Sequence, residues 1–315
     1  MEDSGRKKCA PKVQLHIHLD GSVRVQTVID LALEYDIPLP TYDVDKLKSL
    51  LESYTGSLTK FLEAFKIFAP VYTGKLKALR RIALEFVEDC ENCGLWYCEV
   101  RYCPFLLTGD SLSVYEVMDT IENALKEGSE KYNVKIKSIL SIMLHLPDTA
   151  MKTVEIAKSY ENVVGIDIAG DENTVPKTGY DARFRKAFEE AKNLNISRTV
   201  HAGENGPPWH VEFAIRDLDA QRIGHGYATV KDENVIKLCQ QKHIHLETCP
   251  LSSRATGSVS GDWKNHPLKK IVKLGISFSV NSDDTIMTGK DVRGDFRVCL
   301  DKIGLTRQDL ISSVS

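Results

Sequence analysis

Short apolar runs alternate along the chain with longer stretches in which apolar residues recur every three or four positions. The first pattern is typical of buried strands, and the second is typical of helices with one buried face. The predicted strands are Val13–Leu19, Leu95–Tyr102, Lys135–Met143, Val163–Ile168, Arg198–Ala202, Arg222–Gly224, His243–Thr248 and Ile276–Val280. The predicted helices between them are Gln26–Tyr35, Leu76–Cys93, Val114–Tyr132, Lys152–Tyr160, Asp181–Leu194, His210–Leu218, Lys231–Gln241 and Pro267–Leu274.

Strands that alternate with helices predict a parallel sheet, because parallel neighbours need a long crossover connection. Eight such units predict a closed (β/α)8 TIM-type barrel, which would form one α/β domain over residues 1–315. A doubly wound open sheet is the alternative. The first strand leads into Leu19-Asp20-Gly21-Ser22, which is not the G-x-G-x-x-G of dinucleotide-binding sheets. The barrel is therefore favoured.

One gap between the predicted strands is long, from position 37 to position 74. Within it Leu58, Phe61, Leu62 and Phe65 lie at helical spacing, which predicts extra helices after the first strand. Such a group of side chains either packs as ordinary core or covers a bound ligand, and the pattern alone favours neither interpretation.

The composition excludes several classes of protein. With 42% apolar and 27% charged residues, the chain of 315 residues is ordinary for a globular protein, so disorder is excluded. A net charge of −3 gives no support for a nucleic-acid partner. No apolar run approaches the ~18 residues of a membrane span, and the polar segment 1–12 has no signal-peptide core. We therefore expect a cytoplasmic protein without a membrane span.

Eight cysteines do not change this expectation, because several lie in apolar runs where a free thiol behaves as a small hydrophobic group. Cys90 and Cys93 form a C-x-x-C pair, but no second pair accompanies it. We therefore expect neither a zinc site nor a redox site there.

Histidines and carboxylates gather at the carboxyl ends of the predicted strands, which share one mouth in a barrel. His16 and His18 lie two apart on the first strand, so both side chains point to the same face. His201 and Glu204 end the fifth strand. The other residues of this group are His225 after the sixth strand and Asp283 and Asp284 after the eighth. Because each buried polar group costs desolvation, chance does not explain the gathering.

Three histidines and one carboxylate suit zinc or a similar ion with a position left open for water. His16, His18, His201 and Asp283 are the natural ligands, and Glu204, His225 and Asp284 remain for chemistry. A bound zinc ion lowers the pKa of its water to about 7. The residues therefore predict metal-assisted hydrolysis by a barrel enzyme. His145, at the end of the third strand, is a further candidate for the mouth.

These motifs resemble the adenosine deaminase family over nearly the whole chain. The matching pieces are Pro11 to Ser22 with its H-x-H, His201-Ala202-Gly203-Glu204, Gly224-His225-Gly226 and Ser282-Asp283-Asp284, together with Glu99-Val100-Arg101-Tyr102, Asp167 to Glu172 and Cys249-Pro250-Leu251-Ser252-Ser253. The resemblance implies hydrolytic deamination of adenosine and 2′-deoxyadenosine to inosine, 2′-deoxyinosine and ammonia. It also implies one Zn²⁺ on His16, His18, His201 and Asp283.

The resemblance further implies a role for each remaining residue of the mouth. A hydroxide would attack C6 of the purine while Glu204 protonates N1, and His225 would orient or deprotonate the water. Asp284 would contact N7, the backbone N–H of Gly170 would donate to N3, and Asp20 would bind the ribose. Phe61, Leu62 and Phe65 are the candidate cover over the substrate, and His18 also lies at the substrate.

The sequence departs from the family pattern at a few positions. Gln14 stands where a glutamate is common, Thr285 where a proline is frequent, and Cys103 where a small hydroxyl residue is usual. The chain also stops at Ser315, where relatives continue through further helices, so we expect the C-terminal helices to be truncated. Two alternatives stay open, which are an adenine deaminase and a truncated, non-catalytic barrel with a binding role. A nucleotide substrate is disfavoured, since Asp20 would repel a 5′-phosphate.

Overall fold

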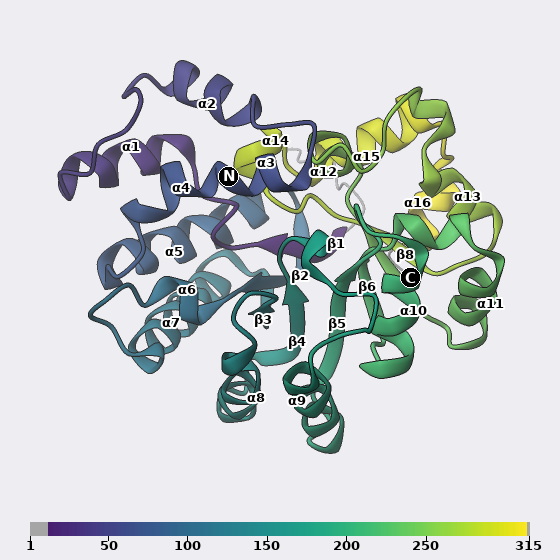
Figure 1. Ribbon diagram of the computed structural model, residues 1–315. Coiled ribbons are helices and arrows are strands. Elements are labelled where there is room, and N and C mark those ends of the chain that lie inside the picture. The colour runs from purple at the N-terminus through teal and green to yellow at the C-terminus, as the bar shows by residue number, and fades with distance from the viewer. Residues whose placement is uncertain (1–11, 314–315) are drawn as a thin grey trace, which may run out of the picture.

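Eight parallel strands form a barrel in the computed structural model, which describes residues 12–313 (Figure 1). The strands pair in the order of the chain, each with the next one. They are β1 (Lys12–His18), β2 (Leu95–Tyr102), β3 (Lys135–Met143), β4 (Val163–Ala169), β5 (Ser197–Ala202), β6 (Arg222–His225), β7 (His245–Thr248) and β8 (Phe278–Val280). The predicted barrel is confirmed. Segment 1–11, for which we expect no signal-peptide core, lies outside the described residues.

Side chains close the barrel between β8 and β1, where main-chain pairing is limited to one bridge between Ile17 and Asp283. Oδ1 of Asn281 accepts the N–H groups of Leu15, at 2.8 Å, and of His16, at 3.2 Å. Oε1 of Gln14 accepts the N–H of Ser282 at 2.8 Å. Two buried amide side chains thus satisfy backbone groups that a longer ladder would pair.

Helices surround the barrel (Figure 1). The α-helices are α1 (Val25–Glu34), α2 (Val44–Glu52), α3 (Leu58–Glu63), α4 (Phe65–Phe68), α5 (Leu76–Asn92), α6 (Pro104–Leu107), α7 (Val114–Tyr132), α8 (Ala150–Ser159), α9 (Ala182–Asn193), α10 (Pro208–Asp217), α11 (Glu233–Gln241), α12 (Pro250–Ala255), α13 (Pro267–Lys273), α14 (Thr285–Thr288), α15 (Val292–Val298) and α16 (Arg307–Ser312). The short helical turns are η1 (Ala69–Val71), η2 (Pro147–Thr149), η3 (Glu172–Thr174), η4 (Tyr227–Lys231), η5 (Trp263–Asn265) and η6 (Cys299–Ile303).

Local signals in the sequence set the ends of these helices. In α7 the side chain of Ser113 caps the backbone of Glu116, whose own side chain caps Ser113 in return. The same helix ends at Asn133, which adopts the left-handed conformation (φ 54°). His243, also left-handed (φ 51°), delays the start of β7 to His245, two residues later than predicted.

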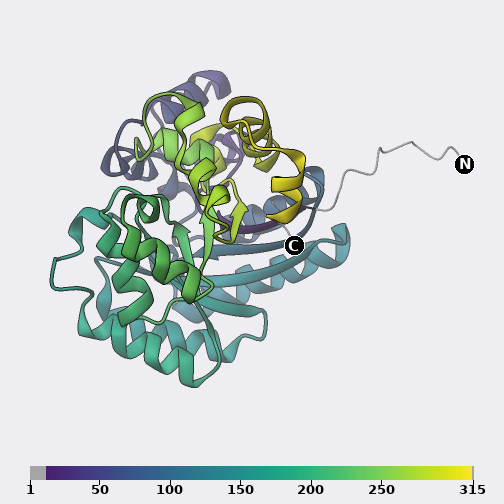
Figure 2. The ribbon, with the colours of Figure 1, turned by 90° about the vertical axis from the view of Figure 1, so that its right-hand side faces the viewer.

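The predicted extra helices after the first strand are confirmed as α2, α3, α4 and η1. The early and late parts of the chain lie side by side there, since α14 packs against α2 (Figures 1 and 2). Within the described range, no helix combines the length and the apolar character that a membrane crossing requires.

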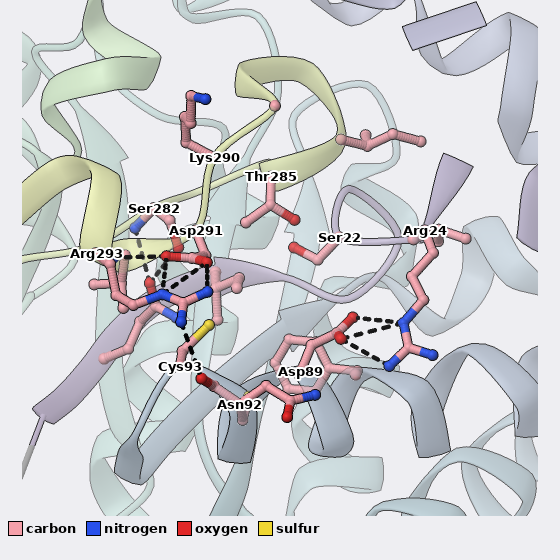
Figure 3. A pocket seen from close by; sticks show the side chains of 18 of the residues that line it. Ser22, Arg24, Asp89, Asn92, Cys93, Ser282, Thr285, Lys290, Asp291 and Arg293 are labelled. Atoms are coloured by element: carbon pink, nitrogen blue, oxygen red, sulfur yellow. Dashed lines mark hydrogen bonds and ion pairs between the residues drawn. The ribbon is translucent and has the colours of Figure 1, made fainter. Parts of the chain in front are cut away.

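A cavity of about 310 Å³ lies on the outer side of the closure between β8 and β1. Figure 3 shows two ion pairs at its walls, Arg24 with Asp89 and Arg293 with Asp291. Cys93, at the C-terminal end of α5, also lines this cavity, and both cysteines of the C-x-x-C pair are buried free thiols. The seam between first and last strand is therefore bordered by polar groups on its outer face.

Candidate active site

Four predicted ligands meet at the carboxyl end of the barrel. His16 and His18 come from β1, His201 from β5, and Asp283 from the segment after β8. Oδ1 of Asp283 lies 3.2 Å from Nε2 of His16 and 3.3 Å from Nε2 of His18. The Nε2 atoms of His18 and His201 are 3.2 Å apart, and one ligand atom from each of the four residues lies within 4.8 Å of the others.

These distances fit a metal ion. A tetrahedral ion with bonds of roughly 2.0–2.1 Å keeps its ligand atoms about 3.3 Å apart, close to the three distances above. Nε2 of His16 and Oδ1 of Asp283 are buried and have no hydrogen-bond partner, a costly state for polar atoms unless a cation binds them. The four residues therefore suit a metal site, as the donor set also indicates.

The opposite nitrogen of two of these histidines is held by a carboxylate. Nδ1 of His16 lies 2.9 Å from Oε2 of Glu247, and Nδ1 of His201 lies 3.0 Å from Oδ2 of Asp167. A carboxylate at Nδ1 fixes the proton there and turns the lone pair of Nε2 toward the metal position. Both rings are thus oriented from below, by β7 and by β4.

One guanidinium joins the two carboxylates. Arg101 of β2 is fully buried, with one amino group 2.6 Å from Oε2 of Glu247 and the other 3.3 Å from Oδ2 of Asp167. Arg222 adds a second contact to Glu247, at 2.7 Å, and a short one to Glu99. Burial disfavours the charged form of Glu247, but the positive charges of Arg101 and Arg222 favour it more strongly. They hold the pKa of Glu247 well below the usual range.

The carboxylate of Asp283 is held in place by its neighbours. Ser252, on α12, donates its hydroxyl to Oδ2 of Asp283 at 2.6 Å. Burial disfavours ionisation of Asp283, but the adjacent imidazoles of His16 and His18 favour its carboxylate more strongly and keep its pKa well below the usual range. The backbone of Asp283 is left-handed (φ 61°), a strained state that concentrates at functional sites.

Glu204 and His225 lie together beside this cluster. Nε2 of His225 is 3.5 Å from Oε2 of Glu204 and 3.9 Å from Oδ2 of Asp283. Burial, with the charges of Asp283 and Glu172, raises the pKa of Glu204 well above its usual range, which favours the protonated acid. Burial lowers the pKa of His225 well below its usual value, which favours the neutral ring. A carboxyl group whose burial favours the protonated form and an imidazole whose burial favours the neutral form therefore lie next to each other beside the four clustered residues.

Asp284 and Asp20 line the same cavity. Burial, with the charges of Asp283 and Asp20, raises the pKa of Asp284 well above its usual range. The side chain of Asp284 lies close to the backbone of Gly21. Only glycine leaves room for it, because a Cβ on residue 21 would lie 1.6 Å from Oδ1 of Asp284. Gly170, with φ at 126°, lines the cavity where β4 ends, a conformation that a side chain would strain.

A cavity of about 890 Å³ opens above the metal cluster. The four apolar residues predicted from the long gap, Leu58, Phe61, Leu62 and Phe65, all line it. Phe61 is fully buried and also belongs to the apolar core, whereas Leu62 and Phe65 are half-buried. The group therefore both packs and covers the cavity. His145 and Cys103 line it as well.

Sequence reasoning assigned no role to several residues that shape this site. Tyr72 lines the cavity and donates its hydroxyl to the backbone oxygen of Asp20 at 3.0 Å. A charged residue within an otherwise apolar strand was the available signal for Arg101, Asp167 and Glu247, because period two places such a residue on the inner face. Ser252 and Glu172 lie in motifs that match the family, but the sequence alone gave neither a role.

Comparison with known proteins supports one family. A family model described as adenosine deaminase matches residues 11–313. Adenosine deaminase of Xenopus laevis is 39% identical over 319 residues, covering 95% of this chain and 87% of the relative. The structure of adenine deaminase from Arthrobacter aurescens has a TM-score of 0.87 at 22% identity and covers 96% of this chain and 91% of that one.

A zinc-bound amidohydrolase from Burkholderia ambifaria has a TM-score of 0.86 at 25% identity and covers 99% of this chain and 88% of that one. The two solved structures agree with the barrel, and the sequence relative and the family model extend over almost all of the chain. The chain therefore belongs to the adenosine deaminase family.

Proposed function

We propose that this chain hydrolyses the 6-amino group of adenosine and 2′-deoxyadenosine, producing inosine or 2′-deoxyinosine and ammonia, with one zinc ion bound. Water adds to C6 of the purine, the bond between C6 and the amino nitrogen breaks, and ammonia leaves. One observation carries the proposal: an acid, a neutral base and a three-histidine, one-aspartate cluster face one cavity in a chain of this family.

His16, His18, His201 and Asp283 would hold the zinc ion, and Glu247 and Asp167 would keep two of the imidazoles aligned. When bound, zinc supplies a Lewis acid that lowers the pKa of a coordinated water toward about 7. The donor set of three imidazoles and one carboxylate favours zinc over magnesium or calcium, which prefer oxygen ligands alone.

Glu204 would donate a proton to N1 of the purine. A proton on N1 draws electrons from the ring and makes C6 accept a nucleophile. Glu204 is 6% exposed, and one of its oxygens is buried with no hydrogen-bond partner, so it has a free position for a ligand atom. Its burial near other carboxylates favours the protonated form that general acid catalysis needs.

His225 would accept a proton from the attacking water. Its Nε2 lies between Glu204 and Asp283, and the neutral ring offers a lone pair in that space. The left-handed backbone of His225 (φ 62°), the last residue of β6, turns the imidazole over the barrel mouth. These distances support a base at His225, on the side of Glu204 that faces the metal cluster.

The other mouth residues would recognise the nucleoside. A protonated Asp284 can donate a hydrogen bond to N7, which is an acceptor on a purine. The backbone N–H of Gly170 would donate to N3, and Asp20 would accept a ribose hydroxyl. Phe61, Leu62 and Phe65 would cover the apolar faces of the substrate and keep out water.

Turnover measured on adenosine, adenine and AMP tests this proposal. Purified protein should remove the adenosine absorbance band and release one ammonia per nucleoside, with adenine and AMP far slower. Metal analysis should find one zinc per chain, and a chelator should abolish turnover until zinc is restored. Preferred turnover of adenine would assign the alternative reaction, and bound zinc without any deamination would support a non-catalytic barrel. The cytoplasmic location stays a prediction.

A further inference from the structure

The segment after β4 contains a buried carboxylate for which the proposed chemistry has no use. Glu172, the first residue of η3, is 1% exposed. Among residues 12–313 no lysine or arginine pairs with it, and the nearest cationic candidate is Nδ1 of His210 at 3.9 Å. A buried acid without a cation is unusual, because desolvation of the charge must be offset by other contacts.

Backbone N–H groups supply those contacts. Oε2 of Glu172 accepts the N–H of Gly206 at 2.5 Å, and Oε1 accepts the N–H of Glu204 at 3.3 Å. Both donors belong to the loop that follows β5 and carries the proposed acid. Glu172 therefore contacts the backbone of Glu204 itself, across 32 positions of the chain.

The same loop is confined from its other side by α10. A Cβ on Gly206 would lie 2.0 Å from Nδ1 of His210 and 2.7 Å from Oε2 of Glu172. A Cβ on Gly203 would lie 2.6 Å from Val211, and its φ of 67° favours glycine as well. The loop thus fits between Glu172 and α10 with no free space at either glycine.

We propose that Glu172 is a positioning residue for Glu204: by accepting two backbone N–H groups of its loop, it fixes the direction in which the Glu204 carboxyl group faces the purine. The inference rests on the proton-donating role proposed for Glu204. Displacement of a reacting group by about 1 Å can cost on the order of 10²-fold in rate. Loss of the Glu172 contacts should therefore reduce the rate of the chemical step.

The neighbouring residue, Asp171, provides a matched contrast. Its Oδ2 accepts the hydroxyl of Thr59 at 2.7 Å, so it holds the start of α3, which carries part of the apolar cover. Two adjacent acids thus contact two different segments at the cavity, Asp171 the start of α3 and Glu172 the loop of Glu204. Substitutions at the two positions should affect different kinetic constants.

The experiment compares Glu172→Gln with Asp171→Asn on adenosine, with kcat expressed per bound zinc. Glutamine keeps the size of Glu172 but presents an N–H₂ group to one of the two backbone donors. We expect kcat of Glu172→Gln to fall about 10- to 100-fold, with KM within about threefold and one zinc still bound. Asp171→Asn should raise KM several-fold and change kcat by less than about twofold.

Gly206→Ala perturbs the same contact while leaving the Glu172 side chain intact. The added methyl group pushes against the His210 ring, at 2.0 Å, and against Oε2 of Glu172, at 2.7 Å, so the loop must move away from Glu172 and this variant should reproduce the selective fall in kcat. Melting temperature and zinc content are measured for all variants, so that a folding defect is recognised as such.

The outcomes separate this inference from the function on which it rests. If Glu172→Gln and Gly206→Ala lose melting temperature but keep wild-type kcat per bound zinc, Glu172 is only structural and the inference is overturned. Glu204→Gln, assayed in parallel, reports on the acid itself. If Glu204→Gln also keeps wild-type kcat, the proposed role of Glu204 as the acid is wrong, and the positioning role that rests on it is wrong too. If Glu204→Gln is inactive while Glu172→Gln and Gly206→Ala keep wild-type kcat, only the positioning role of Glu172 is wrong.

Discussion

Buried carboxylates lie in two regions of the barrel interior: the floor, below the four clustered ligand residues, and the mouth, at the carboxyl ends of the strands. The two regions differ in what compensates the negative charge of these carboxylates. In the floor, arginines contact each acid: Arg101 contacts Asp167 and Glu247, and Arg222 contacts Glu99 and Glu247. At the mouth, no lysine or arginine among residues 12–313 pairs with Glu204, Asp283 or Asp284, and each keeps one buried oxygen without a hydrogen bond.

The difference separates what folding needs from what function needs. A buried charge with its partner is already compensated when the chain folds. Buried oxygens without a partner raise the free energy of the empty site, and a cation or a substrate that binds there recovers part of that cost. The floor therefore acts as support for the mouth, and each of the following variants disturbs one of the two regions.

The largest effect should come from the mouth, on replacement of a ligand histidine. His201→Ala removes one of four donors and leaves a gap that water fills, so zinc affinity and activity should fall together. Metal analysis after dialysis and turnover of adenosine measure the two quantities. His145→Ala, at the exposed rim of the same cavity, is the control and should keep its zinc. Full activity of metal-stripped wild-type protein would contradict the zinc hypothesis.

Glu204→Gln should separate chemistry from metal binding. The amide keeps the size of the side chain but has no proton to transfer, so kcat should fall about 10²–10⁴-fold with a much smaller change in KM. Zinc content should stay at one per chain, since Glu204 is not among the four ligand residues. A zinc-replete variant with near wild-type kcat would exclude the general-acid role.

A smaller effect should follow when the floor is disturbed. Lysine in place of Arg101 offers a point charge that cannot hold Glu247 and Asp167 in the same way as a planar guanidinium. We expect zinc affinity, measured by competition with a chelator, to fall roughly 10- to 100-fold. Arg222→Lys, which changes only the contacts to Glu247 and Glu99, should lose less. Equal losses in the two variants, or unchanged affinity with a lower melting temperature, would assign Arg101 to folding alone.

The smallest effect should come from the cover above the mouth. Phe65→Ala removes a half-buried ring from the cavity wall, so KM for adenosine should rise on the order of 10-fold, with little change in melting temperature. Phe68 packs against Phe65, with ring centroids 4.8 Å apart, but is fully buried in the core. Phe68→Ala should show the reverse pattern, and a similar loss of melting temperature in both variants would make Phe65 a packing residue.

The sequence could predict the barrel and the four clustered ligands because both depend on local patterns. Strand and helix periods are visible in short windows, and H-x-H on a strand fixes two side chains on one face. The sequence could not decide whether the apolar residues around Phe61 pack in the core or cover a ligand. The reason is physical, because this group both contributes to the apolar core and lines the cavity. The roles of Glu204, His225 and Asp284 remain predictions until variants are measured.

The supporting contacts could not be predicted, since they depend on the register between distant strands. Arg101 is visible as a charge inside an apolar run, but its two partners lie 66 and 146 positions later. Gln14 was noted only as a departure from the family pattern, although its amide oxygen contributes to the closure of the barrel. The contact of Glu172 with the loop of Glu204 likewise joins two segments whose spacing carries no local signal.

The closure of the barrel by side-chain amides has a consequence for the chemical ageing of the protein. Nδ2 of Asn281 donates to the hydroxyl oxygen of Ser279 at 3.0 Å and to the backbone oxygen of Thr248 at 3.3 Å, while Oδ1 accepts from β1. Spontaneous loss of ammonia from this one amide would turn a donor into a carboxylate oxygen that faces a carbonyl oxygen, which is costly for a buried group. Asparagine is among the residues that prolonged heating damages, so loss of ammonia at Asn281 would weaken one of the two amide contacts that close the barrel and leave the contact of Gln14 in place.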